Sequence, residues 1–289
     1  MSASITRINA IARTTFTGLV RLKSFYFLLF FALLLIGNSV FMAQFSFQQE
    51  FQVMKDVGLG SMSIFTSLLA IVATAQLLPR DLEDRTLWTI LAKPVSRFEY
   101  LAGKLGGVLL LIALGLITMC AMLLIVLKVR EAAAINETLR QLSASSPEQT
   151  KEALSGIRAA AFNPSLLSGI AIIYAKACLL AALTLFISTF ATTTLFTTSM
   201  MVFIYIIGHL QATARAYWFQ TNSAGWITKA FFLGVTLFFP DLQLFNLVDD
   251  IVAGSTIPIS LLTKTTFMGL VYVGFYLLMA WGVFYRKEL

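Results

Sequence analysis

Six apolar runs, each about as long as a lipid bilayer is thick, constrain this chain more than any other feature. A helix needs about 20 apolar residues, at 1.5 Å rise per residue, to cross roughly 30 Å of hydrocarbon. Only 12% of the 289 residues are charged, whereas soluble domains carry about a quarter. We therefore predict an all-α polytopic membrane protein whose six spans cover about 25–43, 60–78, 105–127, 166–190, 195–211 and 266–285.

The segment before the first span has an amphipathic pattern. In residues 1–24, apolar side chains recur every three or four positions and the arginines lie elsewhere on the helical wheel. This pattern predicts a helix that lies in the membrane interface. A polar connection at 44–57 then separates the first two spans.

Two longer segments interrupt the spans later in the chain. Residues 128–165 are hydrophilic and favour helix, with Pro147 at the first position of a second helix, so they predict an extracytoplasmic helical hairpin. Residues 212–264 contain an apolar run at 230–239 that is long enough for only half a bilayer. We predict extracytoplasmic, re-entrant or interfacial helices there, before the last span.

The distribution of lysine and arginine predicts the orientation. The N-terminal segment, the polar stretch 80–104 and the C-terminus carry 11 of the 21 basic residues. Basic residues in short loops favour the cytoplasmic side. Both termini and residues 80–104 are therefore predicted to be cytoplasmic. The same bias accounts for the net charge of +7, so no nucleic acid is expected as a partner.

The stretch Arg80–Lys104 is a polar island between two spans, with nine charged residues. Pro79 suits the first turn of a helix, and Pro94 ends that helix because it excludes the preceding residue from the α region. Ser96 and Glu99 then form a capping box, in which each side chain satisfies a free backbone N–H of the other. The pattern predicts two helices separated by a proline break.

This island resembles the cytoplasmic coupling region of ABC-2-type transporter permeases. The resemblance rests on an acidic residue, Thr-Leu, Pro-Val-Ser-Arg, an aromatic residue and Gly-Lys, and is carried by Glu83, Thr86, Leu87, Leu91, Pro94, Val95, Ser96, Arg97, Tyr100, Gly103 and Lys104. The family usually has a small residue and glycine before the threonine, where this chain has Asp84 and Arg85. Residues 239–250 and the closing FYRKEL are also similar to one branch of the family.

The resemblance implies one ABC-2-type transmembrane domain over residues 1–289, in a bacterial cytoplasmic (inner) membrane. It implies a permease that exports a lipid-linked or amphiphilic substrate and pairs with a second copy, as a homodimer or a paralogous heterodimer. Each copy would dock a cytoplasmic ABC ATPase through Glu83, Thr86, Leu87, Leu91, Pro94, Val95, Ser96, Arg97 and Tyr100. Segment 1–24 is either a second contact surface for the ATPase or a plain topology anchor.

Motifs for chemistry within this chain are missing. It has one histidine, no HExxH, no G-x-x-x-x-G-K-[ST] phosphate loop and no G-x-S-x-G motif. We therefore expect no enzyme activity, no metal and no cofactor in this chain, with ATP and Mg on the partner ATPase. Membrane lipids are the other expected partners.

Two ionisable residues within the predicted spans are candidates for a substrate path, since such groups are costly in a membrane and are often functional. Lys176 lies in the middle of the fourth span. It either contacts an anionic substrate headgroup or pairs with a carbonyl or an acid across a helix interface. His209 lies near the outer end of the fifth span, where an interfacial histidine is the alternative to a functional one.

Two other functions compete with transport by an ABC permease. A membrane scaffold or assembly factor would use the hairpin at 128–165 as its working surface, for instance to bind an extracytoplasmic accessory protein. An ion-coupled secondary carrier is disfavoured, because such carriers often place acidic residues in broken helices near the midplane. No acidic residue lies within the six predicted spans.

Overall fold

The structure is a computed structural model that describes residues 2–45, 49–84, 95–141, 147–163, 165–191, 193–220, 240–246, 251 and 258–286. In these ranges the chain is helical, with short turns and no strand. The α-helices are α1 (Ser2–Val20), α2 (Lys23–Ala43), α3 (Glu50–Ala75), α4 (Leu77–Glu83), α6 (Arg97–Gln141), α7 (Pro147–Ala161), α8 (Ser165–Ser188), α9 (Thr194–Gln220) and α12 (Ile259–Arg286), and η1 (Leu242–Phe245) is a 3₁₀-helix.

Six of the helical stretches are long and apolar enough to cross a membrane. They cover 23–43, 50–83, 97–140, 148–188, 194–211 and 259–286, and each overlaps one predicted span. The predicted all-α, multi-pass architecture is therefore confirmed. Large apolar side chains on the outer helices face away from the protein, as lipid contact requires; among them are Phe27, Phe30, Phe203 and Phe267, which are 61–69% exposed.

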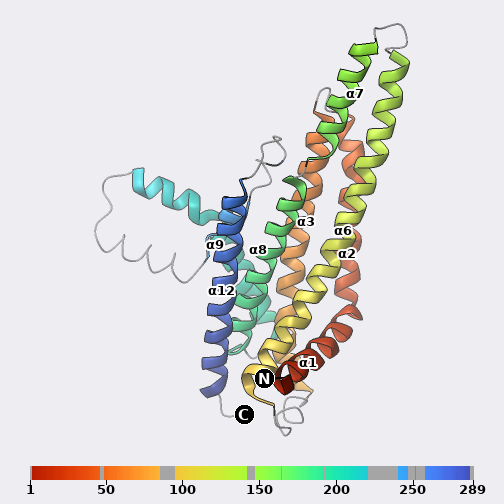
Figure 1. Ribbon diagram of the computed structural model, residues 1–289. Coiled ribbons are helices and arrows are strands. Elements are labelled where there is room, and N and C mark those ends of the chain that lie inside the picture. The colour runs from red at the N-terminus through yellow and green to blue at the C-terminus, as the bar shows by residue number, and fades with distance from the viewer. Residues whose placement is uncertain are drawn as a thin grey trace.

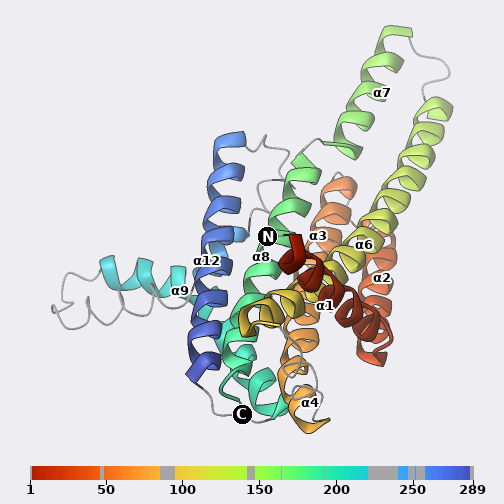
Figure 2. The same cartoon turned by 60° about the horizontal axis from the view of Figure 1, so that its bottom comes forward.

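Both ends of the helical bundle are recognisable in Figures 1 and 2. The start of α1, the end of α12, α4 and the start of α6 lie together, and we call this the terminal end. The far part of α6 and α7 project from the opposite side, which we call the α7 end. The start of α1 and the end of α12 therefore lie on one side of the bundle, as predicted; their cytoplasmic location stays a prediction.

Helix α6 is unbroken for 45 residues, or about 68 Å, roughly twice what the hydrocarbon requires. Its second half packs against α7, whose first residue is Pro147, so the described parts of 128–165 are helical; an extracytoplasmic hairpin stays a prediction. At the same end, α3 begins at Glu50, inside the predicted connection 44–57. The reason is a contact with α6: both Nε and Nη2 of Arg130 donate to Glu50 Oε2, at 3.0 and 2.7 Å.

Helix α9 runs nine residues further than the span predicted to end at Gln211. The predicted re-entrant segment at 212–264 is described only in part: α9 covers its first residues, η1 its middle and the start of α12 its end. The apolar run 230–239 lies outside the described residues.

Helix α8 forms the centre of the bundle, with α3 on one side and α12 on another. It is apolar on all sides and is buried over most of its length. A helix that is hydrophobic all round belongs in an interior position. Its single charged residue, Lys176, is therefore held inside the protein.

Candidate functional site

Two groups of polar residues are candidates for function. The first, which we call the terminal-end cluster, surrounds the beginning of α6 and consists of Ser4, Arg7, Asp81, Ser96, Arg97, Glu99, Tyr100 and Lys104. The second lies inside the bundle around Lys176. Sequence patterns identified part of both groups, but not the contacts within them.

Glu99 links the start of α6 to α1. The predicted capping box is confirmed: the Ser96 amide donates to Glu99 Oε2 at 3.0 Å, and the Glu99 amide donates to Ser96 Oγ at 3.2 Å. The same carboxylate accepts a hydrogen bond from the Ser4 hydroxyl and lies 3.3 Å from Arg7 Nη1. It precedes the charge-free stretch 105–127, the predicted third span. The bond from Ser4, the bond from the Ser96 amide and the charge of Arg7 hold the pKa of Glu99 below its ordinary value.

Asp81 links α4 to α6. Its carboxylate accepts a hydrogen bond from the Tyr100 hydroxyl and forms an ion pair with Lys104 Nζ at 2.5 Å. Tyr100 is fully buried, and this burial, together with the negative charge of Asp81, raises the pKa of the phenol. Both of these contacts of Asp81 are with α6.

Arg97 links α6 to the end of α12. Its Nη1 donates to the carbonyl oxygens of Phe284 and Tyr285 at 2.6 and 2.8 Å. The guanidinium also lies 5.8 and 5.9 Å from the centres of the two aromatic rings. The last carbonyls of a helix have no partner within it and carry partial negative charge, so a cation is favourable there. Arg97 thus joins the third span to the sixth.

Two glycines allow α1 to lie directly on α6. A Cβ atom at Gly103 would be 2.7 Å from Ile11 Cβ, and one at Gly107 would be 2.6 Å from Thr15 Cβ and 2.8 Å from the Ala12 carbonyl oxygen. Glycines four residues apart share one face of a helix and permit close approach of another backbone. The family resemblance included Gly103 but did not indicate this contact. The sequence feature that indicates it is the G-x-x-x-G spacing of Gly103 and Gly107.

The residues predicted to contact an ATPase are placed differently from one another. Glu83 and Ser96 are exposed, and Val95 packs against the core. Arg97 and Tyr100 point inward, toward α12 and α4. Thr86, Leu87, Leu91 and Pro94 lie outside the described residues.

The second group brings together three helices inside the bundle. Lys176 of α8 is only 2% exposed, and its Nζ lies 3.3 Å from Ser63 Oγ of α3 and 3.2 Å from His209 Nε2 of α9. The ammonium also lies 5.4 Å from the centre of the Tyr205 ring. The two residues predicted to line a substrate path are therefore in contact. No spacing in the sequence indicated this, because they lie on different helices.

The hydrogen bonds of His209 define how it meets the lysine. Its Nδ1 lies 3.0 Å from the carbonyl oxygen of Tyr205, one turn earlier in α9. A carbonyl can only accept, so Nδ1 carries the proton and Nε2 is left to accept from the Lys176 ammonium. Neutral histidine is the form that fits these contacts.

A cavity of about 490 Å³ adjoins Lys176. It is lined by Asp56, Gly60, Ser63, Ile64, Lys176, Tyr205, His209 and Asn246. No carboxylate in the described part of the chain forms an ion pair with Lys176. A buried ammonium that is satisfied only by neutral groups can still gain from an anion. The cavity wall thus carries one basic side chain, Lys176, and one acidic side chain, Asp56.

The described ranges contain no cluster of three or more His, Cys, Asp or Glu side chains that could hold a metal ion. Comparison of the chain with models of known protein families and with curated proteins finds no match in either case.

Proposed function

We propose that this chain is the membrane subunit of an ABC-2-type transporter, which exports a lipid-linked or amphiphilic substrate with energy from a separate cytoplasmic ATPase. The sequence of residues 80–104 suggests the family. The observation that carries the proposal is that the first eight residues of α6, 97–104, are attached to three other helices, α1, α4 and α12. A force applied to residues 97–104 would therefore act directly on α1, α4 and α12 as well as on α6.

Coupling follows from these attachments. ATP-driven closure of two ATPases would press on the segment between α4 and α6 in each of two permease copies. Because Glu99, Asp81 and Arg97 attach α6 to α1, α4 and α12, these helices would move together rather than separately. Such a motion does work only if the ATPase binds the two arrangements of the spans with different free energies.

The cavity at Lys176 supplies a place for the substrate's polar end. Lys176 and His209 would lie along the path, with the ammonium attracting an anionic group. The neighbouring helix faces toward lipid are strongly apolar, which suits a molecule that keeps its acyl or polyprenyl part in the membrane.

Variants at two positions test this proposal by separating docking from transmission. Glu83 is exposed, so Glu83→Gln should weaken co-purification of the ATPase and reduce ATP-dependent export. Arg97 faces α12, so Arg97→Gln should keep the ATPase bound but reduce export. Glu152→Gln, the same substitution on exposed α7, serves as the control for Glu83→Gln. Unchanged docking and export in both test variants would contradict the assigned role.

A scaffold function is the second candidate, and the projecting α6–α7 hairpin favours it. Most of that hairpin lies beyond the length that a bilayer requires. A scaffold would lose its partner when residues 131–158 are replaced by a short linker, and it would show no ATP-dependent activity. Export that persists after this replacement would support the transporter and exclude the hairpin as the working surface.

A further inference from the structure

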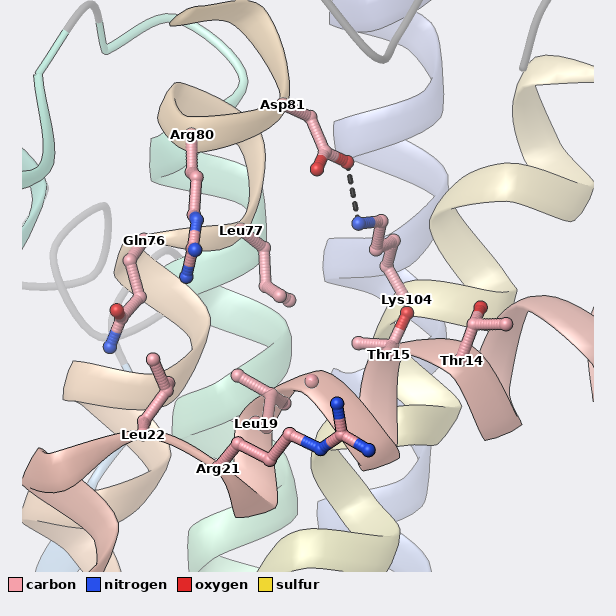
Figure 3. Close-up of a pocket in the computed structure, with 11 residues that line it drawn as sticks. Thr14, Thr15, Leu19, Arg21, Leu22, Gln76, Leu77, Arg80, Asp81 and Lys104 are labelled. Carbon is pink, nitrogen blue, oxygen red and sulfur yellow. Dashed lines mark ion pairs between the residues drawn. The ribbon is translucent and has the colours of Figure 1, made fainter. Parts of the chain in front are cut away.

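A second cavity, of about 480 Å³, lies at the terminal end, away from Lys176 (Figure 3). Its walls come from the last turns of α1, the junction of α3 and α4, and α6. Three basic residues line it, namely Arg21, Arg80 and Lys104. In Figure 3, Arg80 comes from α4 and Arg21 from the turn between α1 and α2, and both belong to the wall of the cavity.

The charge in this cavity is not balanced. Lys104 is neutralised by Asp81 at 2.5 Å. Arg80 pairs with Asp84 at 3.6 Å, but both side chains are about 60% exposed, and ion pairs this exposed to water are weak. No carboxylate in the described ranges forms an ion pair with Arg21. The cavity therefore carries net positive charge from two arginines.

The cavity lies where α2 begins and α3 ends. Leu22 lies directly before α2, the first apolar span, and Leu77 is the first residue of α4, two positions after the end of α3. Both leucines line the cavity, together with Leu19. Arginines beside an apolar wall, at the boundary of the hydrocarbon, offer complementary contacts to a phosphate and to the first carbons of an acyl chain.

We propose that this cavity binds the phosphate headgroup of an anionic phospholipid from the adjacent leaflet. The lipid is held by Arg21 and Arg80 and fills the space between α1 and α4. This site is separate from the proposed substrate path, and it stands whether or not the chain is a transporter. The shared chemistry is a phosphate anion, so the test must distinguish a lipid from free phosphate.

Two kinds of variant test the site in different ways. Arg21→Gln with Arg80→Gln removes the charge, while Arg21→Lys with Arg80→Lys keeps it. Gly18→Leu leaves all charges in place but fills the cavity; a Cβ at Gly18 meets no atom within 4 Å, so α1 can accept the larger side chain. Arg13→Gln, on α1 but outside the cavity, is the charge control. Gly156→Leu, on α7 with equally open surroundings, is the size control.

The measurement is native mass spectrometry of the protein released from phosphatidylcholine nanodiscs with and without phosphatidylglycerol. We expect the double glutamine variant to bind phosphatidylglycerol about 10- to 30-fold more weakly, since each basic residue near a membrane surface contributes a factor of about five. Gly18→Leu should also lose binding, and the double lysine variant and both controls should keep it. Elution as a single species and unchanged circular dichroism show that each variant is folded.

Three results would overturn the proposal. The first is equal phosphatidylglycerol binding by the wild type, the double glutamine variant and Gly18→Leu. The second is loss of binding in the double lysine variant equal to that in the glutamine variant, which would point to packing rather than charge. The third is displacement of the lipid by inorganic phosphate at equal concentration, which would assign the cavity to a soluble anion.

Discussion

Replacing Gly107 with alanine tests whether the close contact of α1 with α6 holds the terminal end together. The added Cβ would lie 2.6 Å from Thr15 Cβ and 2.8 Å from the carbonyl oxygen of Ala12. Ordinary contacts begin at 3.4 Å, so α1 must move away by about 0.8 Å. The carbonyl belongs to the backbone, so no change of rotamer relieves the overlap. Such a shift also separates Arg7 from Glu99, which are already 3.3 Å apart.

The size of the effect follows from the cost of overpacking. An overfilled contact costs about 1–3 kcal/mol, which makes transient undocking of α1 about 5- to 150-fold more frequent. Hydrogen–deuterium exchange of the α1 amides, measured on the protein in nanodiscs, reports this opening directly. We expect faster exchange in Gly107→Ala, and also in Gly103→Ala, where the Cβ would lie 2.7 Å from Ile11 Cβ.

Gly106→Ala is the matched control for this experiment. It lies on the same helix and gains the same helix propensity of about 1 kcal/mol, but its Cβ meets only Ala12 Cβ, at 3.5 Å. Exchange in α1 should therefore stay at the wild-type rate. If Gly106→Ala and Gly107→Ala protected the α1 amides equally, the close approach would not hold α1 in place, and the reasoning would fail.

Three further predictions concern charged groups. The pKa of Glu99 is lowered in the folded protein, so its contribution to α1 docking is present above the ordinary carboxyl pKa and is lost as the pH falls through the lowered value. The protection factors of the α1 amides, which correct for the pH dependence of intrinsic exchange, should be constant from neutral pH to about pH 5 and should fall below about pH 4.5. Glu99→Gln should show no such step. Lys176→Met should leave the free energy of unfolding unchanged or raise it by about 1 kcal/mol, because a buried ammonium is costly. ATP-dependent export should fall. A variant that unfolds but retains export per folded molecule would contradict this prediction. Arg130→Gln should remove two charge-assisted hydrogen bonds to Glu50, at a local cost of about 1–3 kcal/mol. Hydrogen–deuterium exchange of the amides in the first turns of α3 should then be faster. Unchanged exchange there would refute the explanation for the early start of α3.

The spans and the capping box were predictable because they depend on local pattern. A run of 20 apolar residues specifies its own helix in a membrane, since every backbone group must be satisfied within the segment. Ser96 and Glu99 are three residues apart, so their reciprocal hydrogen bonds need no other part of the chain. The start of α3 could not be predicted in this way, because it depends on Arg130, which lies 80 residues later.

The contact of Lys176 with His209 shows the limit of pattern reasoning in the candidate site. Each residue was notable alone, as an ionisable group in an apolar run. Their meeting depends on which faces of α8 and α9 are turned toward each other, and α8 is apolar all round, so its sequence favours no face. Ser63 of α3 was not identified at all, because serine is common in spans as a small packing residue.

The polar contacts at the terminal end hold four helices in fixed relative positions, and the reason lies in how helices associate in membranes. Within the hydrocarbon, lipid chains are as apolar as the helix surfaces, so the hydrophobic effect does not select one arrangement of the spans over another. Hydrogen bonds and ion pairs are directional, and at this end Glu99, Asp81 and Arg97 each join α6 to a different helix. These contacts therefore fix the relative positions of α1, α4, α6 and α12 more strongly than apolar packing alone does. A partner that pressed on residues 97–104 would therefore move these helices together rather than separately, as the proposed coupling requires.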